Sequence, residues 1–139
     1  MRPEALKALQ RSDLIIHCGD IGNPAVLSAL ERVAPVRAIR GNNDRDAWAR
    51  DLPATEIITA GTHSIYFLHN LSELALDPAA AGFAAVISGH SHKPVIKRVN
   101  GILFVNPGSA GPRRLKLPVT VATLAIRPGG CEAGIIELI

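Results

Sequence analysis

Short hydrophobic runs alternate with polar, glycine-containing loops along the whole chain, and this alternation predicts an α/β fold. Helices are expected where apolar residues recur at helical spacing or where a proline opens a first turn: residues 3–9, 24–33, 46–50 and 78–81. Strands are expected at the remaining apolar runs: residues 14–16, 36–39, 56–60, 64–68, 84–87, 95–99, 102–105, 119–126 and 134–138. Helices and single strands alternate early and hairpins dominate later. This order predicts a layered sandwich of two mixed β-sheets flanked by helices.

Polar side chains follow four of the predicted strands directly. The segments are His17–Asp20, Gly41–Asp44, His69–Asn70 and Gly89–His92. Taken singly, each segment has an ordinary explanation as a turn, a helix cap or a surface histidine. Together they place carboxylate, amide and imidazole groups where strands of an α/β sheet end, and such a mixed donor set suits Mn, Fe, Zn or Mg. The pattern therefore predicts a metal site at the carboxyl edge of the sheet.

Composition narrows the class of protein. A chain of 139 residues supports one domain, here residues 1–139, with one real core. The formal charge of +3 is scattered without a basic stripe, and aromatic residues make up 4%, so nucleic-acid binding is possible but not indicated. No apolar run approaches about 20 residues, so we expect no membrane association. Two cysteines far apart in sequence, Cys18 and Cys131, predict a reducing, cytoplasmic location.

The polar loops also carry a family resemblance. Gly19-Asp20, Gly41-Asn42-Asn43-Asp44, His69, the run from Gly89 to Pro94 and the run from Asn106 to Ser109 occur in the order found in the calcineurin-like metallophosphoesterases. The chain resembles in particular the small YfcE-like phosphodiesterases, over essentially its whole length. The resemblance implies two divalent ions about 3.5–4 Å apart that hold a phosphate and generate a hydroxide nucleophile.

The same resemblance implies a ligand set. Asp20 would bridge both ions, and Asn42, His69 and His90 would complete the second site. His92 would belong to the first site. Manganese is the expected metal, with Ni, Zn, Fe or Mg as alternatives, and a single-ion site on Asp20, Asn42, His69 and His90 stays open.

The chain departs from the family pattern in two places. Family members begin with a strand that ends in Asp-x-His, whereas this chain begins at Met1-Arg2-Pro3. We therefore expect an N-terminally truncated domain whose first strand is missing, weak or absent activity, and a free sheet edge that favours a homo-oligomer. Asn43 stands where many members carry His, and an amide can donate a hydrogen bond but cannot deliver a proton. Asn43 and Asp44 are nevertheless the candidate catalytic residues, with Asp44 expected to orient Asn43 or to cap the next helix.

Other residues have more modest expectations. Ser109 and Arg113 are candidates for contact with a phosphate oxygen, against the alternative of a structural loop. His17 is expected to pack beside the site, and Cys18 to be a small buried hydrophobic residue. The predicted function is a metal-dependent hydrolase of small phosphodiesters. The alternative is a non-catalytic metal-binding or scaffold module of the same fold.

Overall fold

The computed structural model describes residues 2–111 and 117–138. Its α-helices are α1 (Pro3–Ala8), α2 (Pro24–Glu31) and α3 (Pro78–Ala81), and its 3₁₀ turns are η1 (Ala47–Ala49) and η2 (Leu71–Glu73). Its strands are β1 (Ile15–His17), β2 (Val36–Ala38), β3 (Thr55–Ala60), β4 (His63–Leu68), β5 (Phe83–Ile87), β6 (Pro94–Val99), β7 (Ile102–Pro107), β8 (Thr120–Arg127) and β9 (Gly130–Glu137).

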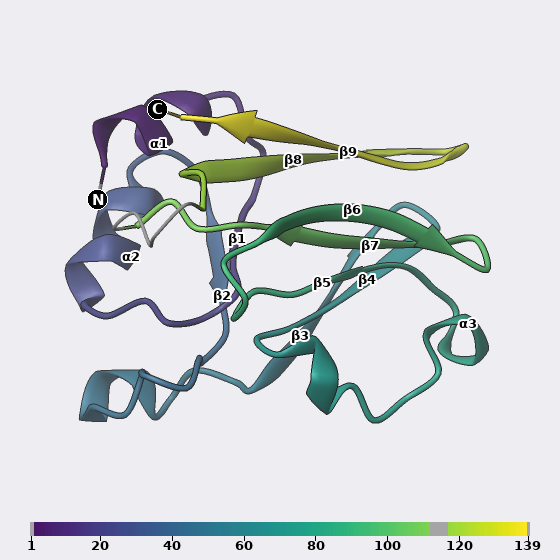
Figure 1. The fold of residues 1–139 in the computed structure, drawn as a ribbon, viewed down its shortest axis with the longest axis horizontal. Helices are drawn as coiled ribbons and strands as arrows, with labels where there is room; N and C mark the ends of the chain where they lie inside the picture. The colour runs from purple at the N-terminus through teal and green to yellow at the C-terminus, as the bar shows by residue number, and fades with distance from the viewer. Residues whose placement is uncertain (1, 112–116, 139) are drawn as a thin grey trace.

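The strands form one large sheet and two small ones (Figure 1). The large sheet has the order β3-β4-β5-β7-β6, in which β4, β5 and β7 run parallel and the two outer strands run antiparallel to their neighbours. β1 and β2 form a parallel pair, and β8 and β9 form an antiparallel hairpin. The expected second sheet is thus present as two separate two-stranded pieces among the described residues.

The main core lies between the large sheet and the two small ones. Alternate residues of the central strands point into it, including Ile65 and Phe67 of β4, both with no exposed surface. Partly buried residues of β8 and β9 close the other side: Ala122, Leu124, Ile126 and Ala133. Period-two burial turns one face of the large sheet toward this core, while the parallel direction of β4, β5 and β7 brings their carboxyl ends to one edge.

Helices cover the outer surfaces. Leu30 of α2 is 1% exposed and packs with Ile15 and Ala34 in a smaller core that α1 also joins through Leu6 and Leu9. Asn23 caps α2 by accepting a hydrogen bond from the Ala25 amide at 2.8 Å, and Pro24 opens the first turn. The described residues contain no helix long and apolar enough to cross a membrane.

The sequence predictions of the elements are confirmed, with small shifts at the ends. The Asn100-Gly101 turn joins β6 to β7 with φ values of 50° and 80°, as a two-residue hairpin requires. The last strand begins at Gly130, four residues before its expected start, because Cys131 pairs with Ile126 and extends the hairpin to the Pro128–Gly129 turn. The layered α/β fold class is confirmed.

Candidate metal centre

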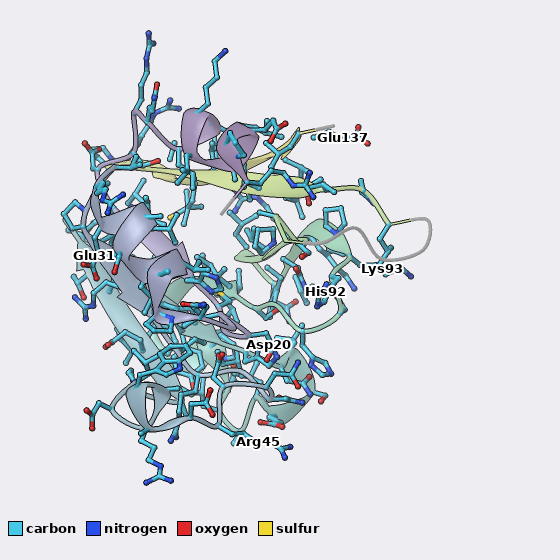
Figure 2. All side chains as sticks on the ribbon, turned by 90° about the vertical axis from the view of Figure 1, so that its left-hand side faces the viewer. Asp20, Glu31, Arg45, His92, Lys93 and Glu137 are labelled. Carbon is cyan, nitrogen blue, oxygen red and sulfur yellow. The ribbon has the colours of Figure 1, made fainter. Side chains whose placement is uncertain are left out.

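The four polar segments that the sequence singles out follow strands β1, β2, β4 and β5. Because β1 and β2 are parallel, and β4 and β5 are parallel, each pair of segments emerges at one edge of its sheet. Figure 2 views that edge, with Asp20 and His92 labelled on it. The topology thus explains how residues separated by up to 70 positions come together.

Three of the predicted ligands form a tight cluster. One donor atom from each of Asp20, His69 and His90 lies within 4.8 Å of the other two. The His69 Nε2 atom is 3.3 Å from Asp20 Oδ2 and 3.2 Å from His90 Nδ1. The two imidazole rings meet edge to face with centroids 5.1 Å apart. A carboxylate and two imidazoles therefore point toward one small volume.

The hydrogen bonds of His69 indicate what belongs in that volume. Its Nδ1 atom lies 2.6 Å from the carbonyl oxygen of Cys18, which can only accept, so Nδ1 carries the proton. The other ring nitrogen, Nε2, faces both the Asp20 carboxylate and His90 Nδ1. A carboxylate oxygen and imidazole nitrogens around one small volume are ligands that divalent cations accept, so the donor set fits such an ion.

Backbone strain concentrates at the same residues. Asp20, His90 and His92 have φ values of 55°, 68° and 62°, in the left-handed region that disfavours side chains. Each such residue costs about 1–3 kcal/mol unless the surroundings hold it there, and strain of this kind gathers at functional sites. Three strained residues among the predicted ligands therefore support a functional role for this edge.

Two glycines allow the Asp20 and Asn42 loops to touch. A Cβ atom on Gly41 would lie 2.2 Å from the Asp20 backbone nitrogen, and one on Gly19 would lie 2.6 Å from the Gly41 nitrogen. Neither position has room for a larger residue. Gly89, in contrast, would meet its neighbours only at ordinary contact distances of 3.4 Å or more.

Asp44 joins these two loops. Its carboxylate accepts hydrogen bonds from the amides of Ile21 at 2.9 Å, Gly22 at 3.1 Å and Gly41 at 2.9 Å, and the residue is 6% exposed. It does not cap η1, which has no side-chain cap bond. Three backbone donors surround the Asp44 carboxylate and give it a positioning role, and its part in catalysis stays a prediction.

Asn42 and Asn43 lie on the exposed rim of the cluster. The backbone amide of Asn43 donates a hydrogen bond to Asp20 Oδ1 at 2.9 Å. This bond orients the Asp20 carboxylate so that Oδ2 faces His69. Asn42 shares with His69 the wall of an open cleft of about 240 Å³. No recorded contact brings the Asn42 side-chain oxygen into the cluster, so its role as a ligand stays a prediction.

His92 lies outside the three-residue cluster. It is half-buried, and in Figure 2 it lies on the same edge as Asp20, next to Lys93. The loop that carries His90 is fastened by Asn106, whose Nδ2 donates to the Gly89 carbonyl at 2.9 Å and to Ser91 Oγ at 3.1 Å. Asn106 has no signal in the sequence for this role beyond its place in the resemblance.

The remaining candidates have structural partners. Ser109 Oγ accepts from the Gly111 amide at 3.2 Å, and Arg113 lies outside the described residues. Burial lowers the pKa of His17, although Asp44 and Asp20 oppose the shift, and its Nδ1 accepts from the Gly19 amide at 3.2 Å. Burial raises the pKa of the Cys18 thiol to about 12, so this side chain is a packing residue.

The chain matches known proteins over nearly its whole length. Residues 1–129 match the model of the calcineurin-like phosphoesterase superfamily domain. The chain belongs to this family. A probable metallophosphoesterase of Methanothermobacter thermautotrophicus is 31% identical over 143 residues, which cover 97% of this chain and 82% of the relative.

Solved structures support the same fold for this calcineurin-like phosphoesterase. An archaeal phosphodiesterase superposes with a TM-score of 0.76 at 22% identity, covering 96% of this chain and 90% of its own. Vps29 of Entamoeba histolytica, complexed with zinc, superposes with a TM-score of 0.75 at 20% identity, covering 100% and 91%. Both likenesses concern the fold, and the metal centre is judged on the residues of this chain.

Proposed function

We propose that this phosphoesterase hydrolyses small phosphodiesters at a centre built around Asp20, His69 and His90. The observation that supports this most strongly is the convergence of Asp20, His69 and His90, whose ligand atoms lie within 4.8 Å of one another, with Asp20 Oδ2 and His69 Nε2 3.3 Å apart. A divalent cation in this volume would be within reach of all three. A phosphodiesterase of Methanocaldococcus jannaschii that is 29% identical over 110 residues, 69% of this chain, supports the choice of substrate class.

Divalent cations bound here would neutralise charge on the phosphate and lower the pKa of water to supply the nucleophile. We expect two ions, with manganese preferred, from the ligand set that the family resemblance implies. Asp20 would serve both ions. Asn42, His69 and His90 would hold one of them, and His92 would contribute to the other.

The protein's own groups would orient the ligands and the substrate. The Cys18 carbonyl accepts a hydrogen bond from His69 Nδ1 and leaves Nε2 available. The backbone amide of Asn43 fixes the Asp20 carboxylate. The exposed Asn43 side chain would donate a hydrogen bond to a phosphate oxygen. Because an amide delivers no proton, the leaving alcohol must depart without one, which favours diesters with acidic leaving groups.

Metal content and hydrolysis, measured on the same preparation, test this proposal. The purified chain, reloaded with Mn²⁺ after chelation, should bind two equivalents of metal by elemental analysis. It should hydrolyse bis(p-nitrophenyl) phosphate faster than p-nitrophenyl phosphate. Metal binding without hydrolysis of either ester would favour the non-catalytic module, and one equivalent would favour a single-ion site.

Matched variants separate the centre from the rest of the chain. Asp20→Asn and His69→Asn should each lower kcat/KM by at least about 100-fold, since each removes a group that holds the cation. Asp51→Asn and His63→Asn change the same residue types at sites remote from the cluster and should leave kcat/KM within twofold. Equal losses in both sets of variants would contradict the proposal.

We also propose a reducing, cytoplasmic setting. Cys18 and Cys131 are both free and both buried, as in proteins that do not rely on disulfides. Fractionation of the native host followed by detection of the protein tests this location, and recovery outside the cytoplasm would contradict it.

A further inference from the structure

Next to the cluster lies a cleft whose chemistry differs from that of the metal centre. Its volume is about 240 Å³, and it is lined from one side by Arg40 and Asn42 and from the other by Thr55, Leu68, His69 and Glu73. Because His69 belongs to the cluster and also to this wall, a group attached to a phosphate at the cluster would reach the cleft directly. The volume is below the about 300–1,000 Å³ of pockets for drug-sized ligands, so it fits one small group.

The cleft has fixed walls. The Arg40 amide donates to the Pro53 carbonyl at 2.9 Å, and Thr55 pairs with Leu68 in the β3–β4 ladder. On the far side, the Glu73 amide donates to the Asn70 carbonyl at 3.0 Å, and the Asn70 side chain caps η2 through the Ser72 amide at 3.1 Å. Backbone bonds therefore hold Arg40 and Glu73 at defined places around the opening.

Both charged side chains of the cleft are exposed and available. Within residues 2–111 and 117–138, neither the Arg40 guanidinium nor the Glu73 carboxylate has a recorded hydrogen bond or ion pair. Nearby, Arg37 of β2 and Glu56 of β3 form an ion pair at 3.2 Å. The charges of Arg37 and Glu56 thus satisfy each other, whereas Arg40, just after β2, and Glu73, in η2, have no such partner in the described part of the chain.

A guanidinium only donates hydrogen bonds and a carboxylate only accepts them. A second anionic group would be attracted by Arg40 and repelled by Glu73, whereas an uncharged group with both hydroxyl or amide donors and acceptors would satisfy both. An uncharged organic group of the diester is therefore the group that this cleft favours.

We propose that this cleft, through Arg40 and Glu73, binds an organic group of the phosphodiester and selects one that is uncharged and rich in hydrogen-bonding groups. This inference rests on the proposed function, because it assigns a substrate group to the same centre. Sugar hydroxyls and the edge of a nucleobase share this chemistry.

Three diesters with the same p-nitrophenolate leaving group test the selection: the methyl, glyceryl and thymidine 5′ esters of p-nitrophenyl phosphate. The wild-type protein should prefer the polar esters to the methyl ester in kcat/KM. Arg40→Gln and Glu73→Gln should each reduce that preference about tenfold, as expected for loss of a hydrogen bond to a charged group. If the protein prefers both polar esters, the cleft recognises hydroxyl groups. If it prefers the thymidine ester alone, the cleft recognises the base.

The ion-paired neighbours supply matched controls. Arg37→Gln and Glu56→Gln remove the same charges from the same region outside the cleft and should leave the preference unchanged. An unchanged preference in Arg40→Gln and Glu73→Gln, or an equal change in the controls, would overturn the inference.

Binding without turnover separates this inference from the proposed function. Glycerol phosphate and thymidine 5′-monophosphate, titrated with Mg²⁺ in solution NMR, should shift the amides of Arg40, Thr55 and Glu73 more than methyl phosphate does. If no diester is hydrolysed but these shifts occur, the proposed function fails and the binding site stands. If hydrolysis occurs without the shifts, the binding site fails and the function stands.

Discussion

The metal centre has a buried half and an exposed half, and they are held in different ways. In the buried half, the Asp20 loop and the Gly41 loop contact each other. The Asp44 carboxylate joins them by accepting hydrogen bonds from three backbone amides. In the exposed half, the His90 loop follows β5 and is held by the Asn106 side chain and by the backbone bond from the Gly89 amide to the His69 carbonyl at 2.9 Å. Figure 2 labels Asp20 of the first half and His92 of the second.

This difference indicates a division of labour. A carboxylate that is to hold a cation is best fixed before the cation arrives, and hydrogen bonds from the surrounding loops achieve this for Asp20. A ligand on an exposed loop can adjust as substrate and product exchange. Substitutions in the buried half should therefore cost stability and metal affinity together, whereas substitutions in the exposed half should cost mainly metal affinity.

The largest effect is expected for Asp44→Ala. It would leave three backbone donors without their acceptor, two of them from the Asp20 loop, and should lower the free energy of unfolding by about 3 kcal/mol or more. Asp46→Ala, at the start of η1 with no side-chain cap bond, is the matched control and should change stability by less than about 0.5 kcal/mol. Urea denaturation measures both, and equal values would contradict the positioning role of Asp44.

Gly41→Ala comes next. The added Cβ would meet the Asp20 nitrogen at 2.2 Å and Oδ1 at 2.3 Å, both held by the fold, so the loops must separate. We expect a loss of about 2 kcal/mol in unfolding free energy, within the range for overpacking, and weaker binding of Mn²⁺ by titration. Gly129→Ala, where nothing lies within 4 Å, isolates the steric part and should be close to neutral. A neutral Gly41→Ala would show that the contact between the two loops is loose.

Asn106→Asp tests the exposed half. The new carboxylate oxygen would face the Gly89 carbonyl in place of the amide donor, so the His90 loop should detach while the sheets remain. We expect about 1 kcal/mol of destabilisation and about tenfold weaker Mn²⁺ binding. Asn70→Asp is the control, because Asn70 uses only its Oδ1 acceptor in the described contacts. If stability falls as far as in Asp44→Ala, the two halves do not differ.

The sequence predicts the helices and strands because hydrophobic periodicity is a local pattern that marks each element. It predicts the convergence of Asp20, His69 and His90 because each of these residues follows closely after such a strand. It does not predict the Asp44 role, since the acceptor and its Ile21 donor are 23 positions apart and no periodicity connects them. Asn106 is missed for the same reason, with 17 positions separating it from Gly89. Side-chain bonds to distant backbone depend on the final packing of loops, which no local pattern encodes.

The smallest expected effect concerns the reactivity of Cys18, which reports whether the buried half opens. Burial raises the pKa of this thiol to about 12, so near neutral pH its thiolate fraction is far below that of an unfolded chain. In a Cys131→Ala background, a disulfide reagent should therefore modify native Cys18 at least about tenfold more slowly than the urea-unfolded chain, since the higher nucleophilicity of a high-pKa thiolate offsets part of the loss. Adding Gly41→Ala should raise the native rate most, because separating the two loops admits water beside Cys18. Adding Asn106→Asp should raise it less, by the smaller opening expected where Gly89 lies against Cys18. Equal acceleration by both would show that the two halves open together.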